Sequence, residues 1–180
     1  MTSVKPSTRD AVLQAMERRR RRQTKARWWR FGAFALLVLV LDQISKAAIR
    51  ATLAPREIVE VFPGLDVSRV TNEGIAFGLF PGRQSAVAVL TVLALCAIAI
   101  ALAGLVARND MVAIGAGLLV GGSLGNLIDR LAHGAVTDFI DFARWPAFNV
   151  ADTGITVGAV LIVLGLLRDG EGGEEDERPG

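Results

Sequence analysis

The chain has 180 residues, of which 52% are hydrophobic, and its mean hydropathy is positive. A soluble globular domain is less apolar, and several runs are too long and too free of charge for buried strands, which indicates an integral membrane protein. The single cysteine, Cys96, excludes an internal disulfide and a cysteine-based metal site, and the single histidine, His133, argues against a zinc enzyme.

Charge is distributed unevenly along the chain. Residues 1–30 hold ten of the twenty Lys and Arg, whereas residues 168–180 hold six of the eighteen Asp and Glu. This composition predicts a disordered basic arm over residues 1–27 and a disordered acidic tail over residues 168–180. Under the positive-inside rule the arm lies in the cytoplasm beside anionic lipid. The arm is not accompanied by a folded nucleic-acid-binding module, so we expect no nucleic-acid partner.

Four apolar segments predict four membrane-spanning helices, at about 28–50, 85–107, 111–131 and 150–167. The first lacks the cleavage pattern of a signal peptide and is interpreted as an uncleaved anchor. The third carries glycines at i, i+4 and i+8, which predict close helix packing. Together the four segments make residues 28–167 one membrane domain, and an even number of spans places both termini in the cytoplasm.

Residues 51–83, between the first two spans, are mixed in character. Alternation in EIVEVF and LDVSRV predicts short strands, and the glycines of TNEGIAFGLF allow close backbone approach. We therefore expect a small β-rich cap outside the cytoplasm, and a second outer loop over residues 132–150. The predicted fold class is an all-α membrane protein of four transmembrane helices with a small β-rich extracytoplasmic cap.

Polar side chains from three of the four spans fall at one depth. With a rise of about 1.5 Å per residue, Asp42 lies about 21 Å from the cytoplasmic end of its helix, and Asp152 about 22 Å. Asp129 lies at about 27 Å, in a hydrocarbon layer roughly 30 Å thick. Charges so close to hydrocarbon are costly, so a common layer near the outer interface indicates a polar site. The acids available to it are Asp42, Asp129, Asp138, Asp141 and Asp152.

Structural roles stay open for these groups. Asp42 and Lys46 are spaced i, i+4 and can form a pair that holds the helices together. Asp129 and Arg130 can do the same. Turn, loop or helix-cap roles fit four further residues: Asn72, His133, Asn149 and Asp152.

Paired carboxylates are the chemistry that this set of residues allows. Two carboxylates held close together share one proton, because both do not ionise easily at short distance. One then activates a water as general base while the other donates to the scissile carbonyl, which is aspartic-peptidase chemistry and needs no metal or cofactor. A Ser–Lys pair is only weakly available, since adjacent Ser45 and Lys46 point to different faces of a helix. Spacing alone leaves open which acids form the pair.

Two functions without peptidase activity also fit this composition. A proton-coupled transporter would use the acids as relay groups, but transporters place such groups near the midplane and often contain repeats, and the two halves of this chain show no repeat. A non-catalytic assembly factor would instead bind lipid through the basic arm.

Four sequence blocks follow one another along the chain: LDQISK, TNEGIAFGLF, GGSLGNLIDRLAHGAVTDFIDF and FNVADTGITVG. The first, second and fourth are similar to the D-x-x-S/T-K, N-x-G-x-A-F and F-N-x-A-D-S blocks of bacterial lipoprotein signal peptidase, or signal peptidase II. The third resembles that family almost throughout. The resemblance covers about 30–167 and omits both tails.

This resemblance implies an aspartic endopeptidase of the bacterial cytoplasmic (inner) membrane, multi-pass, with its active site at the outer face. The implied substrates are prolipoproteins that carry a diacylglyceryl group on the lipobox cysteine, and the cut falls just before that cysteine. The implied catalytic pair is Asp138 and Asp152, and residues 51–83 would form a cradle over it. The residues implied to bind substrate or support the pair are Asp42, Lys46, Asn72, Gly122, Asn126, Arg130 and Asn149.

The chain departs from the family pattern at small residues around the implied pair. Thr137 precedes Asp138 where Val or Ile is usual, and Thr153 stands where Ser is usual. Gly154 replaces the usual Ala, and Gly78 replaces a common Ser. These changes bear on rate and substrate preference more than on the reaction itself.

Overall fold

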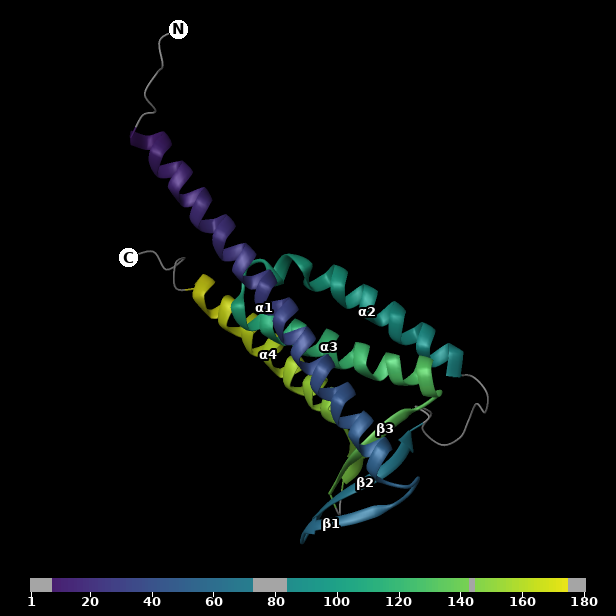
Figure 1. Cartoon of the computed structure of the whole chain (residues 1–180). Helices are drawn as coiled ribbons and strands as arrows, with labels where there is room; N and C mark the ends of the chain where they lie inside the picture. Colours follow the sequence, from purple (N-terminus) through teal and green to yellow (C-terminus); the bar gives the residue numbers. More distant parts are fainter. Residues whose placement is uncertain (1–7, 73–83, 143–144, 175–180) are drawn as a thin grey trace.

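The computed structural model of the protein describes residues 8–72, 84–142 and 145–174. The helices are α1 (Thr8–Thr52), α2 (Gln84–Val106), α3 (Asp110–His133) and α4 (Val150–Glu174). The strands are β1 (Ile58–Phe62), β2 (Leu65–Asn72), β3 (Val136–Phe142) and β4 (Trp145–Phe148). The helices form a bundle with the strands gathered at one end of it, and α1 begins and α4 ends at the opposite end (Figure 1).

Three of the described helices are long and apolar enough to cross a membrane: α1, α3 and residues Val150–Gly170 of α4. The side chains on the outside of the bundle are largely apolar, as a lipid environment requires. The protein is therefore a multi-pass membrane protein that is mostly helical and carries a small antiparallel sheet.

Helix α1 is much longer than a membrane span. Its 45 residues extend about 68 Å, against roughly 30 Å of hydrocarbon. Residues 8–27, for which we predicted disorder, are helical and continue the first span. Arg, Ala, Gln and Lys are good helix formers, and adding turns to an existing helix avoids the cost of nucleation. The helix α4 likewise runs into the predicted acidic tail; residues 1–7 and 175–180 of the two tails lie outside the described residues.

Glycines let the backbone of α3 touch its neighbours. A Cβ on Gly117 would lie 2.5 Å from the carbonyl oxygen of Phe31 in α1, and one on Gly121 would collide with the carbonyl oxygen of Ala35. Gly115 meets the backbone of α4 in the same way. The close packing predicted from the glycine spacing is therefore confirmed, with α3 in the middle of the bundle.

The substitution Gly121→Ala should lower the thermal stability of the purified protein in detergent. The backbone carbonyl of Ala35 occupies the position of the new methyl group and has little room to move, so overpacking should cost about 1–3 kcal/mol. Gly32→Ala on α1 is the matched control, because nothing lies within 4 Å of its new methyl group. Equal melting temperatures for the two variants would contradict the close contact between α1 and α3.

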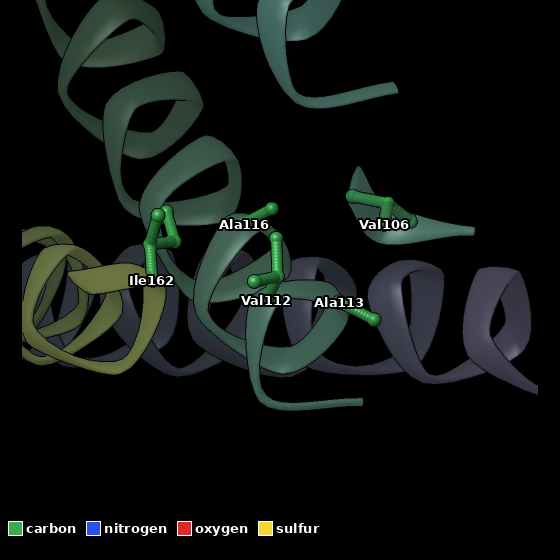
Figure 2. Close-up of a cluster of buried hydrophobic side chains, with 5 residues drawn as sticks. All are labelled: Val106, Val112, Ala113, Ala116 and Ile162. Carbon is green, nitrogen blue, oxygen red and sulfur yellow. The ribbon is translucent and has the colours of Figure 1, made fainter. Parts of the chain in front are cut away.

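An apolar cluster packs the bundle where α2 ends and α3 begins (Figure 2). There Asn109 caps α3 by accepting hydrogen bonds from the N–H groups of its first turn. Arg27 of α1 donates to Asp110 at 2.8 Å, which ties α1 to the same turn. The buried cluster beside these contacts consists of Val106, Val112, Ala113, Ala116 and Ile162.

The four strands form one antiparallel sheet in the order β1-β2-β3-β4. Strands β1 and β2 lie in the predicted cap, but β3 and β4 come from residues 132–150, which we expected to be a loop. Buried Val136 and Phe139 explain the difference, since β-branched and aromatic residues favour a half-buried strand. Asp138 therefore lies in a strand, and the sheet is built from both of the segments that connect the helices at this end. Residues 73–83, the remainder of the predicted cap, lie outside the described residues.

Candidate functional site

The polar residues of the predicted site come together where the bundle meets the sheet. They project from the second half of α1, the end of α3, the start of α4, and from β2 and β3. Four of these side chains are completely shielded from solvent, and they belong to Asp42, Lys46, Asp129 and Asn149. The single polar layer inferred from depth is therefore a connected set of side chains.

Asn149 joins Asp138 to Asp152. Its Nδ2 donates to Asp138 Oδ1 at 2.6 Å, and its Oδ1 accepts from the backbone N–H of Asp152 at 2.9 Å. In return, Asp152 Oδ2 accepts from the backbone N–H of Asn149 at 3.3 Å. The reciprocal bonds form a capping box at the start of α4, so the helix-cap role left open for Asn149 is confirmed. One amide thus lies between the two acids and fixes both.

Asp138 is a buried carboxyl with two amide donors. Its second oxygen, Oδ2, accepts a hydrogen bond of 2.9 Å from Asn72 Nδ2 at the end of β2. Burial raises the pKa of Asp138, and the charge of Asp152 raises it further. Hydrogen bonds from Asn72 and Asn149 and the charge of Lys46 oppose this rise but do not cancel it. Asp138 therefore keeps a proton to higher pH than an exposed aspartate does.

Asn126 links the two acids to the buried charges of α1. Its Nδ2 donates to Asp152 Oδ1 at 2.8 Å. Its Oδ1 accepts from Lys46 Nζ at 2.8 Å and from Asn149 Nδ2 at 3.3 Å. Asn126 and Asn149 therefore each orient one of the two carboxylates through a side-chain N–H.

Buried charges on α1 and α3 support this arrangement. Lys46 Nζ lies 2.9 Å from Asp42 Oδ2 and 3.3 Å from Asp129 Oδ2, so one ammonium serves two carboxylates. The predicted i, i+4 pair on the first helix is thus confirmed. Asp129 also pairs with Arg50 at 3.2 Å, while the neighbouring Arg130 turns away and donates to the carbonyl oxygen of Asn126 at 3.4 Å. Asp129 is therefore a structural anion in this network.

Two other candidate residues, Gly122 and Asp141, are not part of this hydrogen-bond network within the described part of the chain. A Cβ on Gly122 would collide with the carbonyl oxygen of Ala151, so this glycine lets α3 approach the first turn of α4. Asp141 lies three residues beyond Asp138 on β3, which places it on the opposite face of the strand. The sheet therefore separates Asp141 from the other acids.

The sequence interpretation missed two members of the network, Arg50 and Thr137. Arg50 Nη1 donates to Thr137 Oγ1 at 3.1 Å, and the backbone N–H of Thr137 donates to Asp129 Oδ2 at 3.0 Å. A signal for Arg50 was present, because it follows Asp42 and Lys46 at spacings of eight and four residues and so shares their helix face. Thr137 was noted only as a departure from the family pattern, and its contacts had no signal because its strand was not predicted.

Comparisons with known proteins agree with the four sequence blocks. The family model described as Signal peptidase (SPase) II matches residues 34–168. The lipoprotein signal peptidase of Syntrophomonas wolfei is 42% identical over 146 residues, covering 81% of this chain and 95% of that protein. The lipoprotein signal peptidase of Moorella thermoacetica is 40% identical over 147 residues, covering 81% of this chain and 98% of that protein.

A solved structure agrees with these relatives. A bacterial membrane enzyme determined by the in meso method is similar with a TM-score of 0.67 and 34% sequence identity, covering 76% of this chain and 92% of that one. The fold, the arrangement of polar residues and the extent of the sequence matches lead to the same conclusion. The chain belongs to the signal peptidase II family of aspartic peptidases.

Proposed function

We propose that Asp138 and Asp152 are the catalytic pair with which this enzyme removes signal peptides from prolipoproteins. The observation that carries the proposal is the bridge made by Asn149, whose amide binds Asp138 and whose backbone N–H binds Asp152. Both carboxylates are thus held by groups of the same residue, and the charge of Asp152 acts on Asp138, which is the like-charge coupling that aspartic-peptidase chemistry requires. Asp129 is the other acid that the sequence suggested for the pair, but its carboxylate forms ion pairs with Lys46 and Arg50.

In the proposed reaction, Asp138 carries the shared proton, because burial raises its pKa. Asp152 takes a proton from the attacking water, whose oxygen bonds to the scissile carbonyl carbon while Asp138 donates to the carbonyl oxygen. Collapse of the resulting diol returns that proton to Asp138. The proton held by Asp152 passes to the leaving nitrogen as the C–N bond breaks, giving a carboxylic acid and an amine. Asn72 and Asn126 donate to the oxygens of Asp138 and Asp152 that Asn149 does not bind.

We also propose that α2 crosses the membrane together with α1, α3 and α4, which gives four spans in the cytoplasmic membrane of a bacterium. Residues 28–167 then form the membrane domain, both termini are cytoplasmic, and the site opens at the outer face. Two observations support this orientation. The basic arm requires a cytoplasmic start under the positive-inside rule. The sheet, whose strand β3 carries Asp138, lies at the end of the bundle opposite the start of α1 (Figure 1).

This location suits a substrate that is anchored by lipid. We propose that the substrate carries a diacylglyceryl group on its lipobox cysteine and is cut just before that cysteine. The acyl chains would remain among the apolar outer side chains of the bundle, while water reaches Asp152, which is partly exposed. Anchoring by lipid supplies orientation that a soluble peptidase obtains from a deep cleft. The names of the relatives and the one-sided placement of the acids do not favour a transporter or an assembly factor.

Purified enzyme in nanodiscs should cleave a diacylglyceryl-modified prolipoprotein about a hundredfold faster than the same precursor without the lipid, because loss of anchoring misplaces the scissile bond. Mass spectrometry of the released peptide should place the cut directly before the modified cysteine. A precursor with serine in place of that cysteine is the control that accepts no lipid. Equal rates with and without lipid would contradict the proposed role of the anchor, and a cut elsewhere would contradict the proposed cleavage position.

A further inference from the structure

Two arginines bind the end of α1 to the sheet in opposite directions. Arg69 reaches from β2 to α1, where its Nη1 donates to the carbonyl oxygens of Leu53 at 2.8 Å and Arg50 at 3.2 Å. Arg50 lies in the last turn of α1 and Leu53 directly follows the helix, where carbonyl groups have no partners inside the helix. Arg50 in turn reaches from α1 to Thr137 on β3 and to Asp129 on α3. The sheet is thereby fixed on the bundle directly beside Asp138.

The pairing of β2 with β3 is irregular at this point. Asp138 pairs with Val70, and the register shifts between Val70 and Val67. An interrupted ladder constrains a strand less than a continuous one, and a slip of one residue would turn Asp138 to the other face of the sheet. The ladder is regular from Asp138 to Val136 and shifts only beyond Asp138, so contacts outside the ladder add to what holds the strand in place here.

Thr137 supplies those contacts. Its N–H donates to Asp129, its Oγ1 accepts from Arg50, and its carbonyl oxygen accepts from Asn149 Nδ2 at 3.5 Å. Successive side chains of a strand point to opposite faces, so a hydroxyl held toward Arg50 directs the carboxyl of Asp138 toward Asn149. The Val or Ile usual here in the family would offer Arg50 no hydrogen-bond acceptor, which gives the departure at Thr137 a physical meaning.

We propose that Arg50 is a positioning residue for hydrolysis, acting through the hydroxyl of Thr137 to hold Asp138 in line with Asp152. This inference rests on the proposed catalytic pair. Asp129 holds the backbone of Thr137, and Arg50 adds the side-chain contact that sets the rotation of the strand. Arg50 also pairs with the completely buried Asp129, so a variant of Thr137, which leaves this ion pair in place, tests the geometric role apart from stability.

The substitution Thr137→Val tests this directly, since it removes the hydroxyl and keeps the branched shape and the backbone N–H. We expect kcat for a lipid-modified prolipoprotein to fall about threefold to tenfold, the equivalent of one hydrogen bond, with KM and melting temperature unchanged. Thr137→Ser, which restores a hydroxyl, should recover most of the rate. In an Arg50→Gln background, Thr137→Val should cause no further loss, because the partner is already gone.

Arg168→Gln is the matched control, an arginine at the far end of the bundle whose only described side-chain contact is with Met111. It should keep the kcat of the unsubstituted enzyme. Unchanged kcat in Thr137→Val, with or without a lower melting temperature, would overturn the inference, as would a full additional loss in the Arg50→Gln background. Asp138→Asn in the same assay separates the two proposals: if it is inactive while Thr137→Val is fully active, only the role of Arg50 fails. An active Asp138→Asn would overturn the catalytic pair itself.

Discussion

Asp138→Asn and Asp152→Asn should each abolish processing of a lipid-modified prolipoprotein. Each change removes one half of a shared-proton pair, and loss of general acid or base catalysis lowers turnover by about 10²–10⁴-fold. Because the two acids act as a unit, the double variant should be little worse than either single variant. The measurement is the rate constant for cleavage in a single turnover, with the enzyme in nanodiscs. Full processing by both single variants would show that the reaction uses other groups.

Asp141→Asn is the matched control for the loss of a carboxylate, since Asp141 lies on the same strand but on its opposite face. It should retain the activity of the unsubstituted enzyme.

The dependence of the free energy of unfolding on pH is a separate check on Asp138→Asn. Burial raises the pKa of Asp138, so the folded protein holds a proton where the unfolded chain has lost it, and stability falls as pH rises from about 4 through the raised pKa. This slope should be smaller in Asp138→Asn.

The membrane helices could be predicted from the sequence with little ambiguity. Hydrocarbon requires that each backbone polar group be satisfied within its own segment, so a long uncharged run has few alternatives to a helix. The start of α3 at Asp110 lies one residue from its predicted position. The helical arm at residues 8–27 was missed, because charge composition predicts solvation and says nothing of a membrane helix that continues into water.

The candidate site was only partly predictable, because some of its residues lie on helices and others on strands. Depth arithmetic needs the fixed rise of a helix, so it found Asp42, Asp129 and Asp152 but gave no position for Asp138. Asp138 was one of five acids available to the site, and only the family resemblance selected it. Its environment depends on pairing between β2 and β3, which are distant in sequence, and on the contacts of Arg50 with β3. Long-range pairing of this kind leaves little local pattern to detect.

Lys46→Met should be among the most destabilising single substitutions in the protein. The ammonium of Lys46 is completely buried and lies against both Asp42 and Asp129. Removing one partner of a buried ion pair costs about 3–5 kcal/mol, because the remaining charge has no compensation. We expect a sharply lower melting temperature in detergent, or loss of folded protein on extraction. Ser45→Ala is the control on the neighbouring position, since within the described residues its hydroxyl donates to the carbonyl oxygen of Asp42 in its own helix.

A second variant separates lost charge from lost packing. If unpaired carboxylates cause the instability, adding Asp42→Asn to Lys46→Met should recover part of it, because Asp129 would still have Arg50 as a cation. An amide at position 42 could also keep an oxygen for the backbone N–H of Ala151, which Asp42 Oδ1 accepts at 2.9 Å. A double variant no more stable than Lys46→Met would mean that the lysine acts through its packed side chain. Recovery would identify the buried charges as the support that holds α1, α3 and α4 around the catalytic pair.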